Sequence, residues 1–224
     1  MQDLNSKIKN LALDLGADLV GFSNLEKSPI KTNENLINAV TIAVKLPDAV
    51  LQTVIERPTI AYFHEYRSAN ALLDSISFRI ARLIEKEGFL SFPIAASQSL
   101  PESDYASLFS HKHAARKAGL GFIGKSGLFI SREYGSKIRL ATILTNAPIK
   151  PESEEIESGC GNCMVCVNKC PAGAISGKNY AVGMERDEIF SAEKCSHYMK
   201  TFKDVGRGAV CGICIKNCPY NKLI

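Results

Sequence analysis

The sequence predicts an α+β domain over residues 1–150, followed by a small cysteine-rich domain over residues 151–224. Three observations support this prediction. Helix-like and strand-like hydrophobic patterns follow one another up to about residue 146. Residues 150–159 are acidic and poor in apolar side chains, which is typical of a surface connection. All eight cysteines lie at or after Cys160.

The elements of the α+β domain follow from hydrophobic spacing and from the glycines and prolines that end each pattern. Leu4, Ile8, Leu11 and Leu15 recur at helical intervals before Gly16, and a β-branched run ends at Pro47. In chain order we expect a helix over 3–16, strands over 18–22 and 39–46, a helix over 69–87, and a strand over 89–95. A helix over 111–118 and a loop over 119–127 come next. Residues 128–131 and 138–146 are predicted to form a strand pair joined through Tyr134-Gly135-Ser136.

Composition and charge restrict the class of protein. The chain has 224 residues, 46% of them apolar, which is enough for a real core. It contains no apolar run of the ~18 residues that span a bilayer, and its first residues lack the pattern of a signal peptide. We therefore expect a cytoplasmic protein without a membrane partner. The net charge is only +4 and the basic residues are not clustered, so the sequence does not indicate a nucleic-acid-binding protein, although a tRNA partner stays open.

The cysteine spacing predicts two [4Fe–4S] clusters. The run Cys160-x2-Cys163-x2-Cys166-x3-Cys170-Pro171 is that of bacterial ferredoxins. A second run has Cys195 displaced upstream of Cys211-x2-Cys214-x3-Cys218-Pro219. Disulfides would suit a secreted protein, and zinc ribbons separate two cysteine pairs by a long gap, so both alternatives fit this spacing less well.

In the ferredoxin run the fourth cysteine binds the other cluster. This rule assigns the eight ligands to two sets. The first set is Cys160, Cys163, Cys166 and Cys218, and the second is Cys170, Cys195, Cys211 and Cys214.

A glycine-rich segment matches two nucleotide-binding motifs as a string. Gly119-Leu-Gly121-Phe-Ile-Gly124-Lys125-Ser126 satisfies both G-x-G-x-x-G and G-x-x-x-x-G-K-[ST]. Both motifs require a strand before the loop and a helix after it, whereas the predicted order here is the reverse. The segment is therefore either a tight helix-to-strand connection or a cofactor loop, in which glycine lets the backbone approach a ligand and Lys125 offers a mobile cation.

Histidines precede this segment in Ser110-His111-Lys112-His113. Because histidine titrates near neutrality and reductions consume protons, His111 and His113 are candidate proton donors or cofactor contacts. The alternative is a solvated helix start.

Several of these segments together resemble the epoxyqueuosine reductase family. They are residues 118–125, Glu133-Tyr-Gly-Ser136, Leu140-Ala-Thr-Ile-Leu-Thr145 and the crossed cysteine pattern. The resemblance covers about half of the chain, from His111 to Pro219. It implies a nitroreductase-like α+β domain that holds a corrinoid (cobalamin) over the glycine loop, and a ferredoxin-like domain whose two [4Fe–4S] clusters supply electrons. The implied corrinoid-contacting residues are Gly119, Gly121, Gly124, Lys125 and Ser126.

Two departures from the family accompany this resemblance. The family carries a Val-Asp-Thr/Ser-Gly segment whose acid donates a proton, and this chain has Pro101-Glu-Ser-Asp-Tyr-Ala106 there, so Asp104 or Tyr105 would take that role. The sequence also stops five residues after Pro219, without the helical-repeat domain that longer members use for tRNA.

The resulting hypothesis is an oxidoreductase that accepts electrons from a ferredoxin or flavodoxin and passes them through two clusters to a corrinoid. The reduced corrinoid acts on a small-molecule substrate or is itself the product. Two alternatives stay open: a ferredoxin-like electron carrier or partner subunit, and an FMN-dependent reductase, since nitroreductase-like domains commonly hold FMN. The nitroreductase-like resemblance is also compatible with a homodimer.

Overall fold

A computed structural model describes residues 3–32, 35–98, 100, 105–206 and 210–221. It divides the chain into two compact units, each assembled from several stretches of sequence. The first unit consists of Met1–Val44, Ala69–Gly121 and Arg139–Ile156. The second consists of Lys45–Ser68, Phe122–Ile138 and Glu157–Ile224. The cysteine-rich segment thus shares its unit with Lys45–Ser68 and Phe122–Ile138. The predicted boundary at residue 150 assigns both of these stretches to the α+β domain.

The first unit is built on a four-stranded sheet with the strand order β1-β2-β6-β3. Strand β2 pairs with β1, and β3 with β6, in antiparallel registers such as Leu19 opposite Ala43 and Ile94 opposite Thr142. Its elements are α1 (Leu4–Asp14), β1 (Leu19–Asn24), β2 (Asn38–Lys45), most of α3 (Ile60–Lys86), β3 (Ser91–Ile94), α4 (His111–Lys117) and β6 (Ile138–Thr145).

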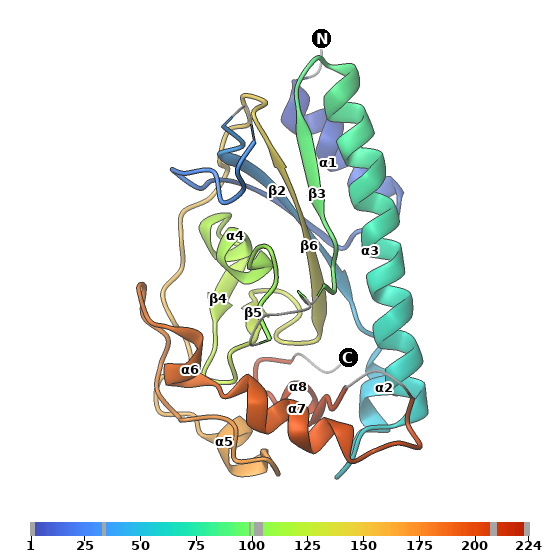
Figure 1. The fold of residues 1–224 in the computed structure, drawn as a ribbon, viewed down its shortest axis with the longest axis vertical. Coiled ribbons are helices and arrows are strands. Elements are labelled where there is room, and N and C mark those ends of the chain that lie inside the picture. Colours follow the sequence, from blue (N-terminus) through green and yellow to red (C-terminus); the bar gives the residue numbers. More distant parts are fainter. Residues whose placement is uncertain (1–2, 33–34, 99, 101–104, 207–209, 222–224) are drawn as a thin grey trace. The chain divides into compact units, whose positions relative to one another are not determined.

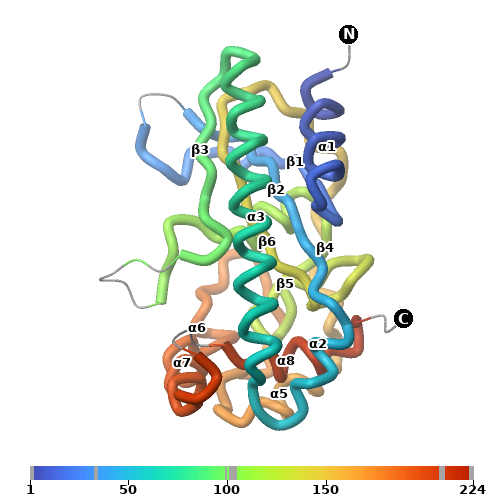
Figure 2. Tube along the Cα trace, turned by 90° about the vertical axis from the view of Figure 1, so that its right-hand side faces the viewer, coloured from blue at the N-terminus to red at the C-terminus, as the bar shows by residue number. Residues whose placement is uncertain are grey.

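Helices cover both faces of this sheet. Helix α1 and the part of α3 in this unit run side by side along one face (Figure 2), and Lys7 of α1 bridges Glu87 just beyond α3 at 2.6 Å. Helix α4 lies on the opposite face (Figure 1), where Ala114 packs against Ala39 and Leu144. Because side chains alternate along a strand, β2 and β6 bury both of their faces, which explains their nearly continuous apolar sequences.

The acidic stretch predicted as a connection is tied down by ion pairs of the first unit. Glu155 accepts hydrogen bonds from Arg116 at 2.5 Å and from Lys117 at 3.3 Å, both at the end of α4. Glu152 pairs with Lys9 of α1 at 3.1 Å. The acidic side chains therefore hold this stretch against basic residues of two helices.

The second unit contains short helices and one hairpin. Its elements are α2 (Asp48–Gln52), the first turns of α3, β4 (Gly121–Ile123), β5 (Phe129–Ser131), α5 (Val165–Lys169), α6 (Arg186–Ile189), α7 (Ala192–Lys200) and α8 (Ile213–Lys216). Helix α7 begins where the Ser191 hydroxyl accepts the N–H of Lys194, and α6 begins with a capping box between Glu185 and Glu188. Helices α5 and α8 lie in contact, as do α2 and α8.

One predicted pairing is wrong. Residues 128–131 and 138–146 do not form a strand pair, because β5 pairs with β4 and β6 lies between β2 and β3. Strand β6 is buried along almost its whole length, so it takes a central position in the larger sheet, whereas the three-residue β5 forms only a small hairpin. The turn at Tyr134-Gly135-Ser136 therefore leads from one sheet to the other.

In the part of the chain that the structure describes, none of the helices combines the length and the apolarity that crossing a bilayer requires.

Candidate functional site

The cysteines of the second unit form two spatial groups. Cys160, Cys163, Cys166 and Cys218 line one cavity, which Cys214 also borders. Of these, Cys160, Cys163 and Cys218 lie near enough to Cys166 for their charges to raise its pKa. All eight cysteines are partly buried and none forms a disulfide. The first group therefore contains the four residues of the first predicted set.

The second group is centred on α7 and α8. Cys211 and Cys170 lie near enough to Cys195 of α7 to raise its pKa, and Cys211, Cys195 and Cys170 do the same for Cys214 of α8, with Cys166 of the first group as its weakest such neighbour. Cys170 directly follows α5, and α5 contacts α8, which carries Cys214. The last cysteine of the first run therefore lies near cysteines of the second run. This proximity is the one that crossed ligation requires, although ligation itself stays a prediction.

Burial and the crowding of thiols raise the pKa of six cysteines, namely Cys160, Cys166, Cys195, Cys211, Cys214 and Cys218. Burial is the largest cause, and it raises the pKa of Cys166 to about 11 and that of Cys195 to about 12. Backbone N–H groups act in the opposite direction at Cys160 (from Lys125), Cys211 (from Ile213) and Cys218 (from Tyr220). Such N–H groups would also stabilise thiolate sulfurs bound to iron.

The glycine-rich segment contains strand β4 and the start of the turn to β5, so the prediction of a loop over 119–127 is wrong for residues 121–123. Gly124 N–H donates to Leu128 O at 2.9 Å, and Gly127 N–H donates to Gly124 O at 2.9 Å. A helix precedes this segment and a strand follows it, so the predicted reversal of the nucleotide-binding order is confirmed. A Cβ atom at Gly124 would clash with Ile130 Cδ1 of the same hairpin and would also lie 3.3 Å from Cys160 Sγ, so glycine allows Ile130 to pack across the turn beside the cysteine.

Lys125 and Ser126 line the cavity of the first cysteine group. Both side chains are buried, with exposed fractions of 5% and 6%. The Lys125 ammonium lies 3.5 Å from Met164 Sδ. Lys125 is thus held in the protein interior, and the expectation that it offers a mobile cation is not supported by its position.

The turn Tyr134-Gly135-Ser136 contacts Cys218, the last cysteine of the chain. Its sequence alone predicts only a connection between two strands. Ser136 N–H donates to Asn221 Oδ1 at 2.9 Å, and the Ser136 hydroxyl lowers the pKa of Cys218 against the larger effect of burial. Gly135 has φ +62°, and a Cβ atom there would lie 2.6 Å from the carbonyl carbon of Tyr220. Glycine at position 135 therefore lets the turn pack against the backbone of Tyr220, and this packing brings Ser136 to Cys218.

The residues of these two groups suit iron–sulfur clusters. The four thiols of the first group and that of Cys214 line one cavity, with a backbone N–H donor at Cys160 and no acidic side chain among the lining residues. Within the described ranges, no three His, Cys, Asp or Glu side chains converge on a single ion. Thiolates are the ligands of [4Fe–4S] cubanes, in which four separate irons each take one sulfur.

The predicted histidines lie in the first unit. His111 Nε2 lies 3.0 Å from Ala95 O and Nδ1 lies 3.0 Å from Thr142 Oγ1. A carbonyl oxygen can only accept, so Nε2 carries the proton and Nδ1 accepts from the threonine hydroxyl. Burial lowers the pKa of His111 to about 4, and the charge of Arg139 acts in the same direction. His111 is therefore a neutral, doubly hydrogen-bonded ring at neutral pH.

We expect His111 to stay neutral, with its proton on Nε2, from pH 8 down to about pH 5, since its pKa is about 4. Long-range proton–nitrogen correlation spectra of protein with labelled histidine would show this, and His111→Gln identifies the signal by removing it. A ring that titrates near pH 6.5, or one protonated on Nδ1, would contradict the hydrogen bonds described above.

The remaining predicted residues are dispersed. Asp104 lies outside the described residues, while Tyr105 is 46% exposed and has φ +59°, an uncommon value for a residue with a Cβ atom. His113 is exposed on α4. In the first unit, Gly119 packs against the chain at Ser153, and Gly121 begins β4. Catalytic roles for Asp104, Tyr105, His111 and His113 stay predictions, as does corrinoid contact by the glycine segment.

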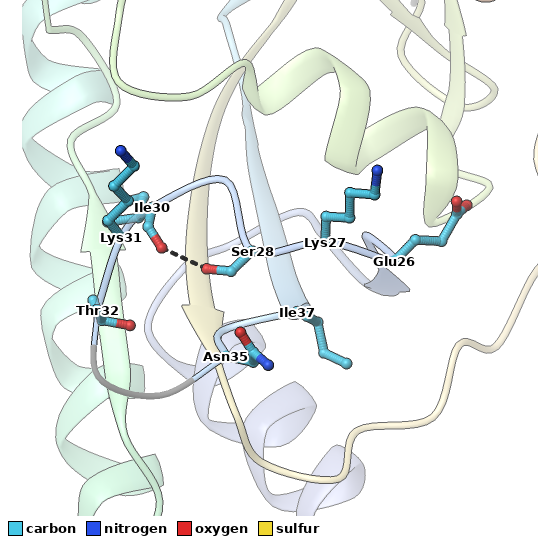
Figure 3. Close-up of a pocket in the computed structure, with 8 residues that line it drawn as sticks. All are labelled: Glu26, Lys27, Ser28, Ile30, Lys31, Thr32, Asn35 and Ile37. Carbon is cyan, nitrogen blue, oxygen red and sulfur yellow. Dashed lines mark hydrogen bonds between the residues drawn. The ribbon is translucent and has the colours of Figure 1, made fainter.

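The connection between β1 and β2 forms a separate pocket of about 450 Å³ (Figure 3). The Ser28 hydroxyl donates to Ile30 O at 2.7 Å across it, while the Lys27 and Lys31 side chains extend away from Asn35 (Figure 3). No residue singled out by the sequence analysis lines it. Its charged groups do not converge, so it offers no candidate site.

Comparison with known proteins gives two results for the sequence. The family of 4Fe-4S double cluster binding domains matches residues 159–221. The chain is also 38% identical over 120 residues to an epoxyqueuosine reductase of Lactococcus garvieae, covering 48% of this chain and 31% of that protein. These results confirm the predicted double-cluster domain and the resemblance to epoxyqueuosine reductases. The chain spans less than half the length of the curated relatives it matches.

Two solved structures share the fold. One is a reductive dehalogenase structure that suggests a mechanism for B12-dependent dehalogenation, with a TM-score of 0.73 and 21% identity over 96% of this chain and 31% of the other. The other is an epoxyqueuosine reductase with a tRNA-Tyr epoxyqueuosine-modified tRNA stem loop, with a TM-score of 0.60 and 20% identity over 97% of this chain and 65% of the other. The mixed arrangement of helices and strands with a double-cluster domain is therefore confirmed.

Proposed function

We propose that this chain is an iron–sulfur oxidoreductase that passes electrons through two [4Fe–4S] clusters to a corrinoid, reducing a substrate or the corrinoid itself. The observation that carries the proposal is the separation of the eight cysteines into two interleaved groups of four. Two redox centres that share one small unit form a path for single electrons, which a purely structural metal site does not need.

The chain's own residues divide the work as follows. Cys160, Cys163, Cys166 and Cys218 would hold the first cluster, and Cys170, Cys195, Cys211 and Cys214 the second. Backbone N–H groups and the Ser136 hydroxyl would orient and stabilise the sulfur ligands. When bound, the clusters supply one-electron transfer. The hairpin turn approaches Cys160 closely, and the Gly135-Ser136 turn contacts Cys218, so both turns would help to position the ligands of the first cluster.

A corrinoid acceptor is supported by the fold. The reductive dehalogenase with this fold is connected with B12-dependent chemistry, and the epoxyqueuosine reductases are reductases by name. We propose accordingly that the first unit is nitroreductase-like and contributes the corrinoid site. Of the glycine segment, Gly119 and Gly121 belong to this unit. FMN is the competing acceptor for a domain of this class.

The proposed partners are a low-potential donor such as ferredoxin or flavodoxin and a small-molecule or corrinoid substrate. A cytoplasmic location suits thiolate ligands, which need a reducing compartment. A tRNA substrate would extend the likeness to the stem-loop complex, of whose protein the chain covers 65%.

Spectroscopy of the anaerobically reconstituted protein tests this function. We expect added cobalamin to bind before any reductant is present, which changes its absorption spectrum, and then to be reduced faster than free cobalamin at the same dithionite concentration. A parallel titration with FMN tests the flavin. Protein that holds both clusters but changes the spectrum of neither compound would contradict the proposal and favour an electron carrier.

A further inference from the structure

Lys125 is a buried cation at the edge of the first cysteine group. Its side chain is 5% exposed, and it lines the same cavity as Cys160, Cys163, Cys166 and Cys218. The backbone N–H of Lys125 donates to Cys160, and the side-chain ammonium reaches Met164 Sδ at 3.5 Å. A thioether sulfur is a weak acceptor without charge, so it does not neutralise the ammonium.

A second buried lysine in the same unit, Lys137, has its charge neutralised by a carboxylate. Lys137 is 1% exposed and forms an ion pair with the carboxylate of Asp48. Within the described ranges, no carboxylate oxygen forms such a pair with Lys125. Burying a charge without a partner is strongly unfavourable, so the protein must supply a negative group at this place. The cavity that it lines contains the four sulfurs of the first cysteine group, together with that of Cys214, and the backbone N–H of Lys125 itself donates to Cys160.

We propose that Lys125 is the built-in counter-cation of the first cluster and that it raises the reduction potential of this cluster. A cubane held by four thiolates carries a net negative charge, and that charge grows by one unit when a low-potential donor gives the cluster one electron. A fixed buried cation therefore stabilises the reduced form more than the oxidised form. The inference rests on the assignment of these four cysteines to one cluster, and it makes Lys125 a positioning and tuning residue.

Redox titration of the reconstituted holoprotein with dithionite, followed by electron paramagnetic resonance, tests this role. We expect Lys125→Met to lower the one-electron reduction equilibrium constant of one cluster by tenfold or more, which equals about 59 mV or more. The other cluster should keep its potential. Lys125→Arg keeps the charge and should stay within threefold of the wild type.

Lys169→Met is the matched control. Lys169 is an exposed cation on α5, directly before Cys170, so water screens its charge. We expect its removal to change either equilibrium constant by less than threefold. A Lys125→Met protein that holds both clusters at unchanged potentials would overturn the proposal, as would an equal effect of Lys169→Met.

Iron content separates the remaining outcomes. If Lys125→Met loses the first cluster while Lys125→Arg retains it, the positive charge is needed and the proposal stands. If both variants lose the cluster, Lys125 serves packing alone and the proposal fails. Wild-type protein that binds no iron would instead contradict the two-cluster function itself, so the two failures are distinguishable.

Discussion

Replacing Cys214 by alanine is expected to reduce the iron bound by the purified protein by about half and to stop electron transfer to any acceptor. Cys214 lies on α8 among Cys170, Cys195 and Cys211, and burial raises its pKa in the absence of iron. In the proposed assignment its sulfur is one of the four ligands of the second cluster, so the variant leaves that cluster with three. Iron analysis and electron paramagnetic resonance of the dithionite-reduced protein provide the measurement.

Cys218→Ala is the matched variant, because Cys218 lies only four residues further along the chain. It belongs to the group that surrounds the cavity with Cys160, Cys163 and Cys166. We expect it to remove the first cluster and to leave the second, so the two variants should lose different resonance signals. Loss of the same signal in both variants, or full iron in either, would contradict the crossed assignment.

Asp48→Asn is expected to destabilise the protein by about 3 kcal/mol, since it leaves the buried Lys137 ammonium without its carboxylate. Lys137 is 1% exposed and follows Ser136, the residue that contacts Cys218. Lys137 lowers the pKa of Asp48, with Lys45 as the second cation at 3.0 Å. For a chain of this size the midpoint of thermal unfolding should fall by about 6–12 °C.

The double variant Asp48→Asn with Lys137→Met supplies the control, because it removes the buried charge together with its partner. Because the double variant leaves no unpaired buried charge, most of the lost stability should return. A single variant that melts within about 2 °C of the wild type, or a double variant no more stable than the single one, would contradict the role given to this ion pair.

Much of the first unit could be predicted because its periodicity is strong. The β-branched run predicted as a strand over 39–46 is β2, which buries both of its faces and is therefore rich in alanine, valine and isoleucine. Helix α3 begins at Ile60, nine residues before the predicted start, because His64, Glu65 and Arg67 interrupt the apolar stripe there. The partner of β5 could not be predicted, since three-residue strands carry no pairing information in their own sequence.

The cysteines of the site could be predicted from the sequence, but the residues that surround them could not. Ligand spacing is set by local chain geometry and is therefore visible in sequence. The position of Lys125 beside Cys160 depends on a hairpin 35 residues upstream of that cysteine, and nothing in the glycine motif distinguishes a phosphate loop from a turn against a thiol. The role of Ser136 was missed for the same reason, because its contact with Cys218 spans 82 residues.

The content of iron and acid-labile sulfide per chain, measured after anaerobic isolation, tests the central claim most directly. Two cubanes predict about eight of each per chain, bound to a brown protein. A colourless protein that contains zinc in place of iron would contradict the account.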